Sequence, residues 1–110
     1  MPPKPYYQDS AVTIYHGDCR DIVPLLGRFD AIITDPPYNE TSLSWDVWPQ
    51  NWPSIVAALS DQLWCFGSFR MFWEKRSEFR DWTLAQDIIW EKQNGTGLAA
   101  DRFRRVHEMA

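Results

Sequence analysis

The chain has 110 residues, of which 45% are hydrophobic and 24% are charged, so it predicts one folded domain and not a disordered or fibrous protein. Its net charge of −4 argues against a stand-alone nucleic-acid-binding domain, which is usually basic. With two cysteines, two histidines and no apolar run of membrane-spanning length, we expect no metal site, no membrane segment and a cytoplasmic location.

Strands and helices are predicted to alternate along the chain. Residues 1–10 are rich in proline and predict an extended N-terminal arm. Strands are predicted over residues 11–15, 29–34, 62–66 and 84–90. Helices are predicted over residues 19–27, 53–61 and 69–82, and residues 99–108 either begin another helix or trail off. This alternation predicts an α/β fold with a parallel sheet and helices on both faces.

The motif Asp-Pro-Pro-Tyr follows the strand predicted over residues 29–34, and it occupies Asp35, Pro36, Pro37 and Tyr38. In an open parallel sheet, ligands bind at the carboxyl ends of the strands. The two prolines have no N–H group, so the motif presents carbonyl and carboxylate acceptors. Its expected ligand is therefore a hydrogen-bond donor such as an amino group, with the ring of Tyr38 available for stacking on a planar ring.

An exocyclic amine of a nucleobase fits these acceptors. A carboxylate that holds the N–H groups would also stabilise the positive charge that develops on nitrogen during attack. An aromatic face attracts a nearby sulfonium cation. In duplex DNA the target base would first have to leave the helix. The alternative is a loop in which Asp35 caps a helix and the prolines end a strand.

Residues 17–39, GDCRDIVPLLGRFDAIITDPPYN, resemble the opening of amino-methyltransferases that act on DNA, in the class whose catalytic motif precedes the cofactor motif. Residues 63–73 and 87–97 resemble the same class, especially its phage and prophage members, and the resemblance covers most of residues 11–108. It implies an S-adenosylmethionine-dependent enzyme with a Rossmann-like, mostly parallel sheet. DNA is then the expected partner.

The resemblance also implies roles for individual residues. The catalytic residues would be Asp35, Pro36, Pro37 and Tyr38, with Asp35 and the Pro36 carbonyl on the target amine and Tyr38 on the flipped base. An Asp in the first position favours adenine N6 over cytosine N4. Asp18 and Asp35 would lie near the cofactor, although Asp18 is also a candidate helix cap. Contacts to nucleic acid are expected from Tyr38, Asn39 and Lys92; a core Trp90 with a surface Lys92 is the alternative.

The glycine-rich Phe-x-Gly-x-Gly loop of this class is not found in the sequence. We interpret residues 65–69, CFGSF, as an ordinary strand end. Residues 11–110 are therefore expected to be the N-terminal portion of a catalytic domain, largely without the cofactor loop and the target-recognition domain, and inactive alone. The surplus of seven tryptophans would then leave apolar surface exposed, and a homodimer is a hypothesis.

Three functions remain open at this point. The first is methylation of adenine N6 in DNA, and the second is a non-catalytic remnant or interaction module. The third is the same chemistry on cytosine N4, RNA or a protein amide. Basic residues gather in the second half of the chain, where they either contact phosphate or lie on solvated helix faces: Arg70, Lys75, Arg76, Arg80, Lys92, Arg102, Arg104 and Arg105.

Overall fold

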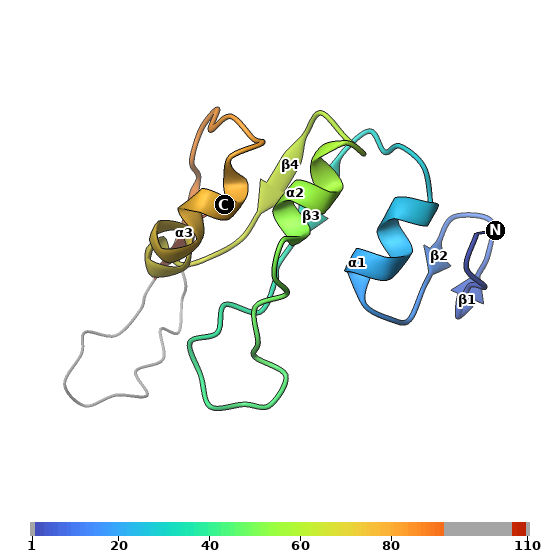
Figure 1. The fold of residues 1–110 in the computed structure, drawn as a ribbon, viewed down its shortest axis with the longest axis horizontal. Helices are drawn as coiled ribbons and strands as arrows, with labels where there is room; N and C mark the ends of the chain where they lie inside the picture. Colours follow the sequence, from blue (N-terminus) through green and yellow to red (C-terminus); the bar gives the residue numbers. More distant parts are fainter. Residues whose placement is uncertain (1, 92–106, 110) are drawn as a thin grey trace.

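The computed structural model describes residues 2–91 and 107–109. Short helices and strands follow one another along the molecule, from the N-terminal strands at one end to α3 at the other (Figure 1). The elements, in which η marks a 3-10 helix, are β1 (Tyr7–Gln8), β2 (Thr13–Ile14), α1 (Cys19–Ile22), η1 (Val23–Leu25), β3 (Ile32–Thr34), α2 (Trp52–Ala57), β4 (Leu63–Cys65), α3 (Phe69–Lys75), η2 (Arg76–Phe79), β5 (Ile89–Glu91) and β6 (His107–Met109).

The N-terminal arm folds back on itself. β1 and β2 form an antiparallel hairpin in which Tyr7 lies opposite Ile14. Asp9 closes the turn, because its Oδ1 accepts hydrogen bonds from two backbone N–H groups within the next three residues, both at 2.8 Å. Part of the arm predicted over residues 1–10 thus pairs with the strand predicted over residues 11–15, and that strand belongs to this hairpin and not to a parallel sheet.

β3 and β4 form a parallel pair, which confirms the α/β prediction at the centre of the chain. Ile32 pairs with Leu63, and Thr34 pairs with Cys65. α2 lies between the two strands in sequence and packs on one face of the pair (Figure 1). Both strands and this helix are where the sequence predicts them, although each is shorter than predicted.

The helices predicted over residues 19–27 and 69–82 are each observed as a short α-helix followed directly by a 3-10 helix. α1 continues into η1, which contains Pro24, and α3 continues into η2. Their starts follow the usual capping chemistry: the side chain of Asp18 accepts the N–H of Arg20, and the side chain of Ser68 accepts the N–H of Met71.

The described strands do not form one parallel sheet. They form three two-stranded sheets, of which only β3–β4 is parallel. In the strand predicted over residues 84–90, the polar pair Gln86 and Asp87 interrupts the apolar pattern, and pairing begins only at Ile89, antiparallel to β6. For residues 99–108 the sequence left open a further helix or an irregular end; residues 107–108 belong instead to β6, and residues 99–106 lie outside the described chain.

One face of the β3–β4 pair is not covered by a helix. Side chains alternate across a strand, so Ile33 and Trp64 point away from α2. Ile33 is 72% exposed and Trp64 is 37% exposed. The prediction of helices on both faces is therefore wrong for this pair, in the part of the chain that the structure describes.

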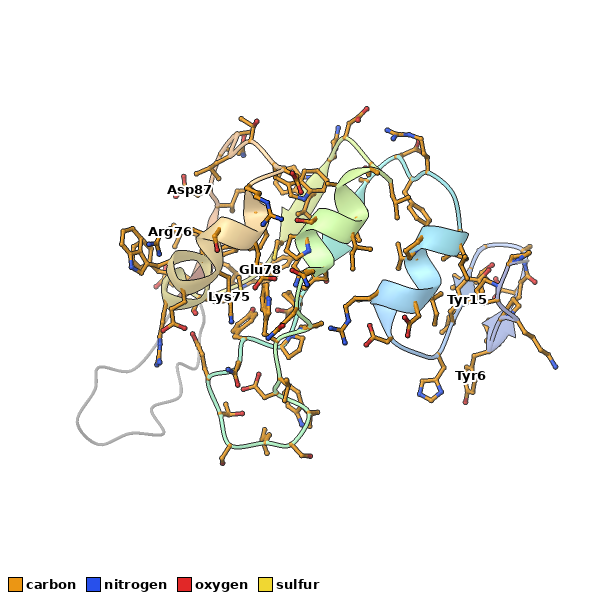
Figure 2. The ribbon with its side chains drawn as sticks, viewed as in Figure 1. Tyr6, Tyr15, Lys75, Arg76, Glu78 and Asp87 are labelled. Atoms are coloured by element: carbon orange, nitrogen blue, oxygen red, sulfur yellow. The ribbon has the colours of Figure 1, made fainter. Side chains whose placement is uncertain are left out.

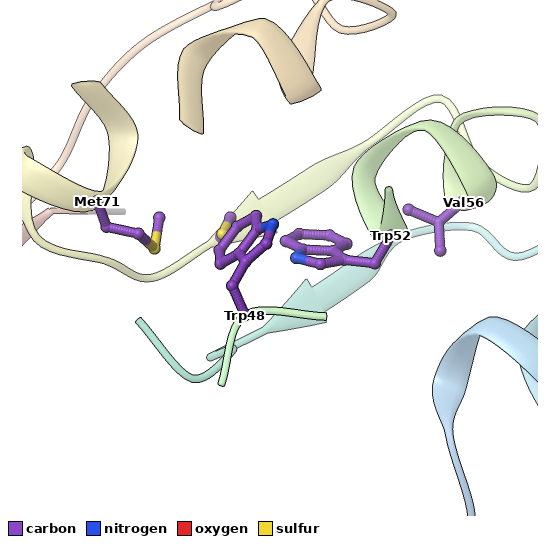
Figure 3. Close-up of a cluster of buried hydrophobic side chains, with 5 residues drawn as sticks. Trp48, Trp52, Val56 and Met71 are labelled. Atoms are coloured by element: carbon purple, nitrogen blue, oxygen red, sulfur yellow. The ribbon is translucent and has the colours of Figure 1, made fainter. Parts of the chain in front are cut away.

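The core centres on two tryptophans, Trp48 and Trp52, whose ring centroids lie 5.7 Å apart. The buried cluster around them is small (Figure 3) and consists of Trp48, Trp52, Val56, Cys65 and Met71. Trp45, Trp73 and Trp90 are by contrast more than half exposed. The surplus of tryptophan is thus divided between the core and the surface.

Glu78 ties η2 to the start of α2. Its carboxylate accepts the indole N–H of Trp48, at 2.9 and 3.0 Å to the two oxygens, and its Oε1 accepts the backbone N–H of Asn51 at 2.7 Å. Glu78 lies between η2 and α2 (Figure 2). Because Trp48 is buried, this carboxylate satisfies a donor that water does not reach.

Replacing Glu78 with alanine should lower the free energy of unfolding by about 2–3 kcal/mol, because it leaves the buried indole N–H of Trp48 without an acceptor. Glu78→Gln keeps one acceptor oxygen and should cost less. The measurement is urea denaturation. Glu74→Ala is the matched control, since it removes an exposed i,i+4 pair worth about 0.5 kcal/mol. Equal losses in Glu78→Ala and Glu74→Ala would contradict this role.

Candidate active site

The Asp-Pro-Pro-Tyr motif lies at the carboxyl end of the parallel pair, as the sequence predicts. Asp35 directly follows β3, and the backbone N–H of Phe66 donates to the carbonyl of Thr34 at 2.9 Å just beyond β4. Asp35 and the residues after β4 therefore leave the sheet at the same edge. Residues 35–38 are not helical, so the alternative in which Asp35 caps a helix is wrong.

Tyr38 orients the carboxylate of Asp35. Its hydroxyl donates a hydrogen bond of 2.5 Å to Asp35 Oδ1, while its half-buried ring packs against the core cluster. Pro36 is buried and Pro37 is half-buried, whereas Asp35 is exposed. Among the described residues nothing donates to Asp35 Oδ2, so this oxygen is available to a donor from solvent.

Cys65 lies next to this carboxylate but is not a candidate nucleophile. It pairs with Thr34 across the strands, and its thiol is buried. Burial and the nearby charge of Asp35 raise the pKa of Cys65 to about 12. The thiol therefore stays protonated near neutral pH and fills space in the core.

The loop after the motif is held by Asp46, a residue that the sequence analysis did not single out. Its buried carboxylate accepts the backbone N–H groups of Asn39, Glu40 and Thr41 at 2.7–3.0 Å, and the hydroxyl of Thr41 at 2.7 Å. The hydrogen bond from the Thr41 hydroxyl, with the three backbone N–H groups, lowers the pKa of Asp46 against the opposing effect of desolvation. In the sequence, the position of Asp46 between the apolar residues Trp45 and Val47 was the signal that could have indicated a buried carboxylate.

Ser68 joins this loop to α3. Its hydroxyl donates to the Glu40 carboxylate and accepts the N–H of Met71 at 3.0 Å. Gly67 precedes it, and a Cβ there would collide with the side chain of Met71. The glycine of CFGSF thus serves core packing, which agrees with its interpretation as an ordinary strand end.

The structure gives Asp18 a local role. Its Oδ1 accepts the backbone N–H of Arg20 at 2.9 Å, and its carboxylate pairs with the Arg20 guanidinium at 2.5 Å. These hydrogen bonds lower the pKa of Asp18 to about 2. Arg20 also donates to the Gln50 carbonyl at 3.4 Å, which connects α1 to the loop before α2. The helix-cap alternative for Asp18 is confirmed.

The structure describes some of the residues that were expected to contact nucleic acid, and Lys92 is not among them. Asn39 is exposed in the left-handed backbone region at φ 58°, a conformation that asparagine tolerates. Trp90 is exposed and lies edge-on to Phe66, with ring centroids 6.0 Å apart, so it is not a core tryptophan. Lys92 lies outside the described residues.

The described part of the chain contains no group of three histidine, cysteine or acidic side chains placed to hold a metal ion. Its helices are also too short and too polar for any of them to cross a membrane.

Comparison with known proteins finds a short similarity to a methyltransferase. The type II methyltransferase M.ScaI of Streptomyces caespitosus is 45% identical to the chain over 38 residues, which are 33% of this chain and 12% of that protein. The match therefore spans a small part of that enzyme. No protein-family model matches the chain. The similarity supports a relationship to methyltransferases in general terms.

Asp46→Asn should lower the free energy of unfolding by about 2–3 kcal/mol at neutral pH, because it removes a buried charged acceptor from four partly buried hydrogen bonds. The folded-state pKa of Asp46 is lowered, so its contribution is present above the unfolded value of about 4 and is lost as pH falls below it. The stability gap between wild type and Asp46→Asn should therefore narrow as pH falls below about 4.

Urea denaturation of both proteins at several pH values measures the difference in their free energies of unfolding. The exposed Asp81→Asn is the control, and it should track wild type at every pH. A gap between wild type and Asp46→Asn that stays constant with pH would contradict the assignment.

Proposed function

We propose that the chain is part of an S-adenosylmethionine-dependent DNA methyltransferase and that it holds the N6 amino group of adenine. The observation that carries the proposal is Asp35: an exposed carboxylate, oriented by Tyr38, at the carboxyl end of a parallel strand pair. The similarity to a type II methyltransferase supports methyl transfer as the class of reaction. The resemblance of the motif region supports a Rossmann-like sheet in the whole enzyme.

The acceptors suit an amine with two N–H bonds. Oδ2 of Asp35 accepts one of them, and the carbonyl of Pro36 is the candidate acceptor for the other. Neither Pro36 nor Pro37 has a backbone N–H that would compete for these oxygens. In this arrangement Asp35 stabilises the charge that develops on the attacking nitrogen.

The residues at the strand end also fit the cationic part of S-adenosylmethionine. When bound, this cofactor supplies an electrophilic methyl group. Asp35 and the ring of Tyr38 would hold its positive end, because a carboxylate and an aromatic face both attract a cation. The carboxylate of Asp18 already serves α1 and Arg20, so we do not assign it to the cofactor.

Adenine N6 is the favoured target because the first motif residue is Asp, and cytosine N4 is the alternative. A non-catalytic module that pairs with another chain is a second candidate function. The open apolar face of β3–β4, with Ile33 and Trp64, favours this second candidate.

The first experiment measures recognition of the amine without the cofactor. A labelled oligothymidylate with one central adenine should bind about tenfold more tightly than the same strand with purine, which lacks the amino group. Asp35→Ala should abolish this difference. Asp21→Ala, an exposed carboxylate on α1, should preserve it. Equal affinity of the wild-type chain for adenine and purine would contradict the proposal, and preference for a central cytosine would favour N4.

Calorimetric titration of S-adenosylmethionine into the chain is the companion measurement. Saturable binding, followed by formation of N6-methyladenine that Asp35→Ala abolishes, is the result expected of a catalytic chain. Binding of neither the cofactor nor the amine would assign the chain to the non-catalytic alternative.

A further inference from the structure

α3 and η2 carry an exposed stack of two rings and a guanidinium, which we call the aromatic stack: Phe69, Trp73 and Arg76. The rings of Phe69 and Trp73 are 16° from parallel, with centroids 6.3 Å apart. The guanidinium carbon of Arg76 lies 4.6 Å from the Trp73 ring centroid. The three residues follow at i, i+4 and i+7, so they share one side of the helix. Phe69 is 68% exposed and Trp73 is 60% exposed.

The aromatic stack forms one wall of a cleft of about 990 Å³. β4 and residues 83–87 form the other sides, and Arg80 adds a second guanidinium. Figure 2 shows Arg76 on the helical wall and Asp87 on the segment above it. A cleft of this size accommodates a nucleotide-sized ligand.

The exposed charge on the helical wall is positive, although the whole chain has a net charge of −4. Glu74 is paired with Arg70 at 2.9 Å, and Glu78 is turned inward to Trp48. Among the described residues, neither Arg76 nor Arg80 lies within ion-pair distance of a carboxylate; they donate to backbone carbonyls instead. Positive charge beside stacked rings favours an anionic partner.

Two acidic residues, Asp61 and Asp87, line the other sides of the cleft, and they weaken its preference for an anionic partner only in part. Asp61 already pairs with Arg28 at 3.1 Å, which leaves Asp87 as the carboxylate without an ion pair among the described residues lining the cleft. Two guanidiniums thus face one uncompensated carboxylate.

The aromatic stack begins at the edge of the candidate active site. Ser68, which caps α3 and donates to Glu40 in the loop after the motif, directly precedes Phe69. From Phe69 to Arg76 the helix rises about 10 Å. A ligand lying along the stack would therefore extend away from the motif and beside α3.

We propose that this cleft binds single-stranded DNA, with bases stacking on the exposed rings and phosphates on the two guanidiniums. Aromatic rings interleaved with arginine suit a nucleic-acid strand, because every base has a planar face and every linkage an anionic phosphate. The inference rests on the proposed function: the cleft holds the strand next to the target base.

Fluorescence anisotropy of a labelled oligothymidylate tests the proposal independently of the amine site, since thymine has no amino group. Trp73→Leu and Phe69→Leu should each weaken binding about fivefold or more. Arg76→Gln and Arg80→Gln should each reduce the slope of log K against log salt by about 0.7, and Arg76→Lys should keep most of that slope.

Tyr6→Leu and Lys4→Gln are the matched controls, because they remove an exposed ring and a cation from the N-terminal segment. If Trp73→Leu binds like Tyr6→Leu, or if the slope is unchanged in both arginine variants, the proposal is wrong. Self-association that Trp73→Leu abolishes, with no binding of DNA, would identify a second copy as the occupant and also overturn it. The preference for adenine over purine reports on the amine site and binding of oligothymidylate reports on the cleft, so failure of either is seen separately.

Discussion

The backbone hydrogen bonds between β3 and β4 determine where the candidate active site lies. Parallel pairing brings Thr34 opposite Cys65, so the chain leaves both strands at the same edge. Asp35 follows one strand, and the start of α3 follows the other. Without this pairing, the carboxylate that would hold an amine and the helix that carries the aromatic stack would not be neighbours.

Two carboxylates, Asp46 and Glu78, then give the loop between β3 and α2 its shape. The loop contains few apolar residues that reach the core, and its backbone N–H groups need acceptors. Asp46 supplies them next to the motif, and Glu78 accepts the backbone N–H of Asn51 together with the side-chain indole N–H of Trp48. Both interactions combine charge with shielded donors, which makes them stronger than surface pairs such as Arg70–Glu74.

The structure also separates two kinds of exposed aromatic and apolar residue. Ile33 and Trp64 lie on the open face of the β3–β4 pair and have an apolar character that suits protein contact. Phe69 and Trp73 stand beside two guanidiniums that have no carboxylate partner among the described residues, and they suit a charged, planar ligand. The same tryptophan-rich composition thus provides a small core, an apolar face and a stacking surface.

The sequence by itself determined the central strands, the helix between them and the position of Asp35 at a strand end, because apolar runs and proline chemistry act over a few neighbouring residues. It also indicated the acceptor character of the motif, since prolines lack N–H groups in any fold. The pairing of β5 with β6 and the open face of β3–β4 depended on contacts between residues that are distant in the sequence. The role of Asp46 was also decided by the folded structure, because only the folded loop brings three backbone N–H groups to its carboxylate.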